Sequence, residues 1–536
     1  MLILANNLLK KYLLISVFIC VHLWLILLTA CGSKPTDIRT VIPADALIYL
    51  EADDLGKAVS AIAENKMFQQ MAKSKPDLSA LKGIKIAVAV TGFETSEQPV
   101  TEENSVLNFQ PRFVAVVETN AWNFQAVSFT ENKLGEFINE VYGGGVELET
   151  SDKNEGKYFI WTSQDGRKAY ALVQGSVIFF GNDESAIEKC LAAKRGESDS
   201  IAKNPKVTTG DRLAFGYVSN DGIAQIANLA GIHLAMASSE EGEVKSFVAR
   251  VLPEILRGSV KEVTWTAAKT ETGIEDKFTI ATAPEVARVF DETLVPAGST
   301  DANLAAYLPA DVLSATRYDL KDPQIAWRSV LLTAQKQTDS VSGNLIAAFS
   351  GSLFEPFGIE DAELMLSSVG PQILTGKFDT AGENVVVIAT VKEPQKARNA
   401  IAKEISFARS PEKQLNADVW KSDDGEISAA FIEDKLIIGD AGSVLKCLQA
   451  KMDGVNFTKS ELFKQFSEGK AVSVTAGKDF ESAGKIVEVL AEKKAADEAN
   501  PINFVTETRF NKNGIERRTV SDFGLIGSII EQFGKE

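Results

Sequence analysis

Cysteine and histidine are the residue types best suited to nucleophilic, redox and metal-binding chemistry, and this chain has few of either. Its 536 residues include four cysteines and two histidines: Cys20, Cys31, Cys190, Cys447, His22 and His233. Cys20 and His22 lie in an apolar N-terminal segment that we expect to be removed, which leaves His233 alone. A multi-histidine zinc site, a Cys-X-X-Cys redox centre and a Ser-His-Asp triad are therefore not expected.

Cys31 ends an N-terminal segment with the layout of a secretory signal peptide. Lys10 and Lys11 precede a 17-residue apolar run at positions 12–28, and small residues follow before the cysteine. A basic start, an apolar centre and small residues at the cleavage point are the parts of such a signal. The alternative is an uncleaved anchor, although the run is shorter than the ~20 residues that a membrane-spanning helix needs.

Leu28-Thr29-Ala30-Cys31 resembles the lipobox of bacterial lipoproteins, in which a leucine stands three places before the cysteine. The resemblance implies a thioether-linked diacylglycerol on Cys31, cleavage before it and acylation of the new amino terminus. Two or three acyl chains anchor a protein stably, whereas one chain binds only marginally. Gly32 stands where an aspartate would favour the inner membrane, so the outer membrane is favoured if the cell has two membranes.

The 506 residues that follow the signal segment are too many for one hydrophobic core, so at least two domains are expected. The net charge of −17 becomes −19 when the two lysines of the signal segment are removed. Such an acidic chain lacks the positive surface that binds nucleic acid or anionic lipid. We therefore expect no nucleic-acid partner, and we expect attachment to the membrane through the lipid alone.

Four short motifs occur twice in the same order, which indicates a tandem duplication. The matched motifs begin at Pro43 and Pro309, Trp161 and Trp420, Lys189 and Lys446, and Gly273 and Gly514. Their offsets fall from 266 to 241, as expected if the second copy accumulated small deletions. We predict a signal peptide at 1–30, a polar tether at 31–40, a first repeat at 41–291, a linker at 292–305 and a second repeat at 306–536.

Within each repeat, β-rich runs alternate with amphipathic helical runs. Residues 158–180 predict three strands of a meander, with turn signals at Gly166 and Gly175. Asp54 and Asp183 are placed to cap the helices that follow them. Consecutive strands joined by tight turns favour antiparallel pairing. The predicted class is α+β, with two tandem homologous domains, each mainly an antiparallel sheet with helices packed on one face.

Two pairs of equivalent residues are the main candidates for a site in the folded part of the chain. Cys190 and Cys447 occupy matching helix positions, where a cysteine usually packs as a small apolar side chain. In an oxidising exported space, a disulfide between the repeats or a reactive thiol stays open as an alternative. Trp161 and Trp420 occupy matching strand positions and are predicted to anchor the core. If the sheet face is open there, they become the candidate binding surface.

The remaining polar motifs are interpreted as structural. Asp45 and Asp311 follow Pro-Ala at a turn, where a short acid satisfies backbone donors, and neither has the loop of an aspartic protease. The acid-rich turn 423–426 does not match a calcium loop, and the glycines 143–145 follow a helix instead of opening one. The sequence therefore predicts no metal site, no cofactor and no catalytic residues, although His233 could serve as a lone general base.

The opening Pro-Ala-Asp strand, the W-X-S-X-D-G hairpin and the helix ending in Cys-Leu-X-Ala-Lys resemble an uncharacterised bacterial lipoprotein family. Its members are secreted or lipid-anchored and carry a domain of unknown function, in tandem in some of them. The resemblance implies a cell-envelope location but supplies no reaction, cofactor or catalytic residue. We expect a non-enzymatic binding or scaffold protein with an envelope protein as partner. A small-molecule-binding module using the cleft between the repeats is the alternative, and a hydrolase is the third possibility.

Overall fold

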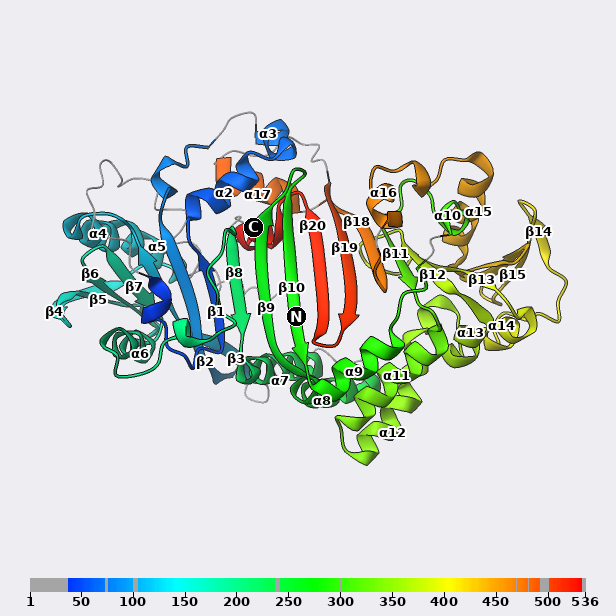
Figure 1. Cartoon of the computed structure of the whole chain (residues 1–536), viewed down its shortest axis with the longest axis horizontal. Coiled ribbons are helices and arrows are strands. Elements are labelled where there is room, and N and C mark those ends of the chain that lie inside the picture. Colours follow the sequence, from blue (N-terminus) through cyan, green and yellow to red (C-terminus); the bar gives the residue numbers. More distant parts are fainter. Residues whose placement is uncertain are drawn as a thin grey trace.

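The computed structural model describes residues 37–72, 76–99, 105–236, 242–298, 301–468, 470–480, 482–491 and 501–532. The predicted signal segment and the lipobox residues Leu28, Thr29, Ala30 and Cys31 lie outside the described residues. The described strands form one continuous sheet that runs along the length of an elongated molecule (Figure 1). The two repeats are therefore joined within one sheet, because strands of the first repeat pair with strands of the second.

The strands of the first repeat lie in the spatial order β4-β5-β6-β7-β3-β2-β1-β8-β9-β10, and every neighbouring pair is antiparallel. Their bounds are β1 (Ile48–Ala52), β2 (Lys85–Pro99), β3 (Ser105–Glu118), β4 (Glu147–Lys153), β5 (Gly156–Thr162), β6 (Lys168–Gln174), β7 (Val177–Gly181), β8 (Ala214–Val218), β9 (Val260–Lys269) and β10 (Ile274–Thr282).

The second repeat has the same spatial order, with each strand number raised by ten. Its strands are β11 (Ser314–Asp319), β12 (Val369–Lys377), β13 (Val385–Val391), β14 (Glu412–Gln414), β15 (Ala417–Lys421), β16 (Ile427–Ile432), β17 (Lys435–Asp440), β18 (Ser473–Asp479), β19 (Ile502–Asn511) and β20 (Gly514–Ser521).

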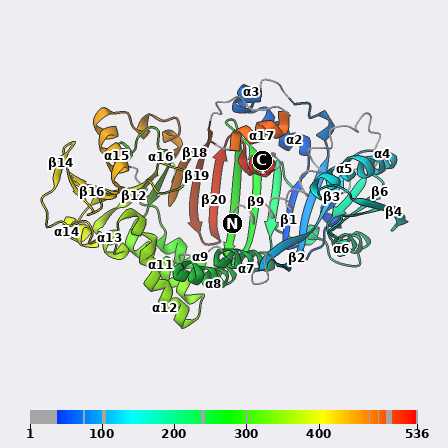
Figure 2. The same ribbon diagram turned by 180° about the vertical axis from the view of Figure 1, so that it is seen from behind.

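The repeats meet at the centre of the sheet, where β10 pairs antiparallel with β20 (Figure 1, Figure 2). The repeated Gly-Ile-Glu motif makes each residue of β10 equivalent to the residue 241 positions later in β20. Lys277 lies opposite Arg518, which is its own equivalent. The pairing is therefore two-fold symmetric about these two residues, as in the interface of a symmetric dimer. Two equivalent ion pairs flank the axis, Lys277–Glu516 at 2.8 Å and Arg518–Glu275 at 2.6 Å.

The helices connect and cover these strands. The first repeat has α2 (Leu55–Ala63), α3 (Lys66–Ala72), α4 (Asn123–Phe129), α5 (Gly135–Val141), α6 (Glu184–Arg195), α7 (Asn220–Met236), α8 (Gly242–Ser259) and α9 (Pro284–Thr293). The second has α10 (Ala302–Ala305), α11 (Pro323–Lys336), α12 (Ser340–Phe349), α13 (Ala362–Ser368), α14 (Pro394–Ala400), α15 (Ala441–Asp453), α16 (Phe463–Glu468), α17 (Ser482–Ala491) and α18 (Gly524–Glu531).

Aspartate caps fix where several of these helices begin. The side chain of Asp54 accepts a hydrogen bond from the backbone of Lys57 at the start of α2, and Asp183 does the same for Ser185 in α6. These bonds satisfy backbone donors that have no partner within the helix. Both caps were predicted from the sequence and are present. Within the described part of the chain, no helix is both long enough and apolar enough to cross a bilayer.

The last helix of each repeat crosses the centre of the sheet to the other repeat. Helix α9, which follows β10, contacts α11 and β19 of the second repeat. Helix α18, which follows β20, contacts α2 and β10 of the first repeat. The exchange is reciprocal, as expected from the two-fold symmetry of the β10–β20 pairing. The repeats are thus held together by helix packing as well as by strand pairing.

Side chains of the outer strands pack against helices on both faces of the sheet. Along β3, Ala115 and Val117 join the core under α2, α4 and α5, whereas Val114 and Val116 join the core under α6. This division follows from the two-residue period of a strand. The α+β class and the mainly antiparallel sheet predicted from the sequence are confirmed. The helices were expected on one face, and here they cover both, because both faces of β3 carry apolar side chains.

Candidate functional site

The two cysteines of the described chain are buried and form no disulfide. Cys190 and Cys447 are free and fully buried, and they lie in separate core clusters. Burial raises the pKa of both thiols, because an apolar surrounding disfavours the thiolate. The prediction that they pack as small apolar side chains agrees with this placement. No disulfide joins them in the described chain, and their burial does not suit a reactive thiol.

Both predicted tryptophans lie in the core. Trp161 is 2% exposed and stacks on Phe159 with ring centroids 5.6 Å apart. Trp420 is 7% exposed, and its indole N–H donates to the carbonyl oxygen of Arg409 at 2.9 Å. The guanidinium of Arg398 lies 5.1 Å from a ring centroid of Trp420. The sheet face is therefore covered at both positions, so the condition for a tryptophan binding surface is not met.

The predicted structural aspartates and glycines take local roles. Asp45 is exposed and forms an ion pair with Lys189 at 2.8 Å, while Asp311 lies exposed in the other repeat. Asp424 accepts hydrogen bonds from the hydroxyl of Ser422 and the backbone of Glu426. Among the described residues, no group of three or more potential ligands is placed to hold a metal ion. The glycines 143–145 all have positive φ after α5, as a helix end requires.

A buried polar network at β1 was not anticipated from the sequence. Tyr49 donates to a carboxylate oxygen of Glu51 at 2.5 Å, and Arg212 donates to the other oxygen. The Arg212 guanidinium also lies 3.9 Å from the ring centroid of Phe215. Burial raises the pKa of Glu51, against the opposing effect of its two hydrogen-bond donors. This network connects β1 to the segment before β8, and within it the Nε of Arg212 is buried with no hydrogen-bond partner among the described residues.

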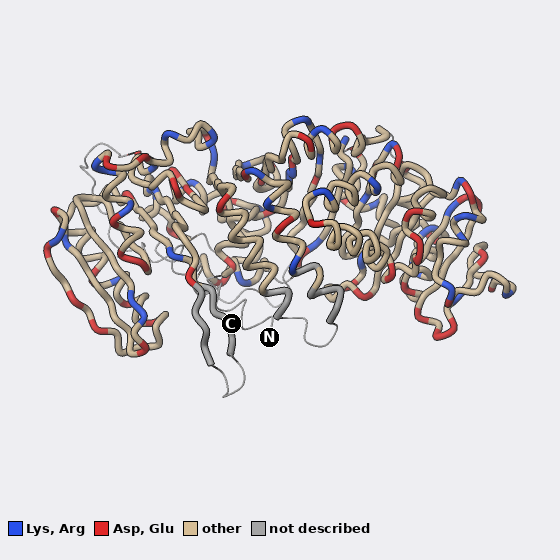
Figure 3. Tube along the Cα trace, turned by 90° about the horizontal axis from the view of Figure 1, so that it is seen from below, with Lys and Arg blue, Asp and Glu red and all other residues tan. Residues whose placement is uncertain are grey.

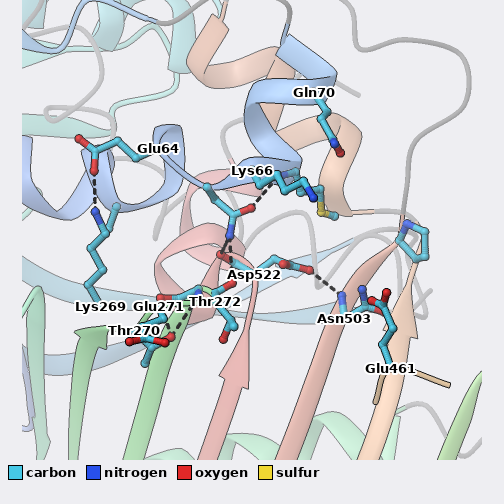
Figure 4. Close-up of a pocket in the computed structure, with 15 residues that line it drawn as sticks. Glu64, Lys66, Gln70, Lys269, Thr270, Glu271, Thr272, Glu461, Asn503 and Asp522 are labelled. Atoms are coloured by element: carbon cyan, nitrogen blue, oxygen red, sulfur yellow. Dashed lines mark hydrogen bonds and ion pairs between the residues drawn. The ribbon is translucent and has the colours of Figure 1, made fainter. Parts of the chain in front are cut away.

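A cavity of about 670 Å³ lies beside the β10–β20 pairing and is lined by both repeats (Figure 4). We call it the junction pocket. The first repeat supplies the end of α2, the start of α3 and the β9–β10 turn at residues 269–273. The second repeat supplies Glu461, Pro501, Asn503 and Asp522. The sequence offered no signal for it, because its walls come from segments that are far apart in the chain.

Polar contacts hold the walls of the junction pocket in place (Figure 4). Lys269 and Glu64 form an ion pair at 2.5 Å across the first repeat. Asn65 donates to the backbone oxygen of Asp522 at 2.9 Å, which connects the repeats. The Asp522 carboxylate accepts from the backbone N–H of Asn503 at 2.8 Å. Burial raises the pKa of Asp522, because the carboxylate loses water that these hydrogen bonds replace only in part.

The lining of the junction pocket is predominantly polar. Its described lining combines cationic, anionic, amide and hydroxyl groups, including Lys66, Gln70, Thr270 and Thr272, and it includes neither cysteine nor histidine. A ligand there meets hydrogen-bond donors and acceptors on walls fixed by the fold. The small-molecule-binding alternative predicted from the sequence uses a cleft between the repeats, and the junction pocket is lined by both repeats with mostly polar residues.

Comparisons with known proteins add little to this description. No protein family and no curated protein matches the chain. A solved structure described as "Structure of crystal form I of TP0453" aligns with 44% of this chain and 99% of that chain, at 7% sequence identity and a TM-score of 0.22. So low a structural similarity carries no conclusion about fold or function. The expected membership of an uncharacterised lipoprotein family stays a prediction.

Charged residues of both signs are spread along the molecule. Seen from below, acidic and basic positions are interspersed over both repeats (Figure 3). Many of them form ion pairs at the surface, such as Lys153–Glu184 and Lys396–Glu393. The junction pocket is thus distinguished by its lining from both repeats, and not by a field of one sign.

Proposed function

We propose that this chain is a lipid-anchored, non-enzymatic protein of the bacterial cell envelope that binds a small polar ligand in the junction pocket. The anchor rests on the lipobox resemblance at Leu28-Thr29-Ala30-Cys31. The binding role rests on one observation, the cavity that both repeats line with polar side chains.

The chemistry of the lining indicates the class of ligand. Lys66 offers ammonium donors, Glu271 and Glu461 offer carboxylate acceptors, and Thr270 and Asn503 offer neutral polar groups. A molecule that carries both donors and acceptors, such as a short zwitterionic peptide or a sugar, can satisfy more of these groups than a hydrocarbon can. Because the described lining has no nucleophile activated by a base, binding without covalent chemistry fits it best.

The test places a bulky side chain in the junction pocket, at a position whose equivalent in the other repeat lies outside the pocket. Thr272 is exposed in the β9–β10 turn and lines the pocket, and its equivalent 241 positions later is Asn513, exposed in the β19–β20 turn. Thr272→Trp fills part of the cavity, so we expect it to weaken ligand binding by at least about tenfold, equivalent to about 1.4 kcal/mol. The matched control Asn513→Trp leaves binding unchanged.

The measurement is titration calorimetry with a ligand first found by thermal shift in a panel of short peptides and sugars. If the panel contains a ligand whose affinity survives Thr272→Trp, the junction pocket is not its site. Equal losses in Thr272→Trp and Asn513→Trp would also contradict the proposal, because they would indicate a general effect on stability.

A further inference from the structure

Strand β4 forms one free edge of the long sheet. It pairs with β5 along its length, and all seven of its residues are exposed. The other edge of a strand in this position carries backbone N–H and C=O groups that another strand can pair with. Exposure along the whole of β4 means that side chains of the described chain leave this edge accessible.

The hairpin turn shows which backbone groups point outward. The β4–β5 connection is a two-residue turn with positive φ at Asn154 and Glu155, and Lys153 lies opposite Gly156. In such a turn the flanking residues form a hydrogen-bonded pair, and hydrogen bonding alternates along the strand from there. The backbone groups of Leu148, Thr150 and Asp152 therefore point away from β5, toward the free edge.

The sequence of β4 is complementary to itself over its full length in one register. Antiparallel pairing of two copies centred on Thr150 places Leu148 opposite Asp152 and Glu147 opposite Lys153, and it pairs all seven residues. The Lys153 ammonium already contacts Glu184 and Glu188 of its own copy. Its third N–H is available to donate to the Glu147 carboxylate of the other copy. Registers centred at 147, 148, 149, 152 or 153 set like charges opposite each other, which is destabilising. Centring at 151 pairs fewer residues.

We propose that two copies of this chain associate through antiparallel pairing of their β4 strands, with the two-fold axis at Thr150. The chain already pairs two strands about a two-fold axis internally, in β10 and β20. The like charges of Lys277 and Arg518 on that axis are each offset by an ion pair with a glutamate. The occupant of the β4 edge is a second copy, since the strand supplies both members of the Glu147–Lys153 pair, which forms twice about the axis.

The opposite edge of the sheet does not offer the same interface. Strand β14 has three residues, and its two-residue turn at Leu415 and Asn416 directs the backbone of Lys413 outward. Two copies paired there would set Lys413 against Lys413. Association through β4 alone closes after two copies, whereas pairing at both edges would produce an open filament.

Disulfide trapping tests the proposed register in the full-length chain in membranes. In the Thr150→Cys variant the two new thiols lie opposite each other, at a Cα separation of about 5.5 Å that a disulfide can bridge. Oxidation is expected to convert most of the protein to a covalent homodimer on a non-reducing gel. The matched control Lys413→Cys, at the outward position of the other edge, stays monomeric. A monomeric Thr150→Cys protein, equal dimer formation by both variants, or cross-links to other proteins would overturn the proposal.

A second variant tests the charge pairing without relying on the new thiol alone. Adding Glu147→Lys to Thr150→Cys sets a lysine opposite Lys153 of the other copy, and the residue is exposed, so the fold should tolerate the change. We expect the rate of dimer trapping to fall at least about twofold. An unchanged rate would overturn the Thr150-centred register.

Discussion

Asp276 is a buried carboxylate that connects the two repeats. It is 3% exposed, and it accepts hydrogen bonds from the indole of Trp265 at 2.8 Å and from the backbone N–H of Leu525 at 2.7 Å. Trp265 belongs to the first repeat and Leu525 to helix α18 of the second. Burial is the largest influence on Asp276 and raises its pKa, while the two donors oppose that rise.

The raised pKa of Asp276 predicts a pH-dependent contribution to stability. Between the unfolded pKa near 3.8 and the higher folded pKa, the folded protein binds the extra proton, so stability from this group falls as the pH rises. Asp276→Asn does not titrate, so its stability relative to the natural protein should improve as the pH rises through that window. Urea unfolding at several pH values measures this difference.

The control for Asp276→Asn is Asp424→Asn, which should behave in the opposite way. The Ser422 hydroxyl and the Glu426 backbone N–H lower the pKa of Asp424, so its contribution to stability is lost as the pH falls. If the two variants show the same sign of pH dependence, burial does not control the ionisation of Asp276.

At the scale of elements, the β10–β20 pairing carries two equivalent ion pairs whose side chains are partly exposed. Pairs of this kind contribute roughly 0.2–1 kcal/mol each. We therefore expect Glu275→Gln and Glu516→Gln to lower the free energy of unfolding by less than about 1 kcal/mol, and by similar amounts. Urea unfolding of both variants provides the comparison. If one variant lost several times more free energy of unfolding than the other, the surroundings of the two ion pairs would not be equivalent.

The elements themselves were largely predictable, whereas their association was not. Turn glycines, capping aspartates and strand-like runs are local signals, so the meander at 158–180 and the starts of α2 and α6 followed from the sequence. Nothing local shows that Lys277 lies opposite Arg518, because edge pairing depends on which strands are left free by the rest of the fold. The junction pocket was missed for the same reason, since Asn65 and Asp522 meet only after the repeats have paired.

At the scale of the whole molecule, the proposed membrane location rests on one residue outside the described structure, Cys31. If Cys31 carries the lipid, Cys31→Ala should abolish labelling by palmitate and move the protein out of the detergent-extracted membrane fraction. Metabolic labelling followed by fractionation tests this. The control is Cys190→Ala, which removes a buried thiol and should stay fully labelled. A Cys31→Ala protein that is still labelled would contradict the lipobox interpretation.

The two-fold pairing of β10 with β20 has a consequence for how the protein can evolve. In a symmetric dimer encoded by one gene, every substitution appears twice, on both sides of the axis. In a fused chain each half accumulates its own substitutions, and the halves differ. Strand β4 has seven residues and β14 three, and both tryptophans pack on phenylalanine but Trp420 also lies beside the guanidinium of Arg398. The two ends of the sheet therefore differ, while the central strands β10 and β20 keep a two-fold symmetric pairing.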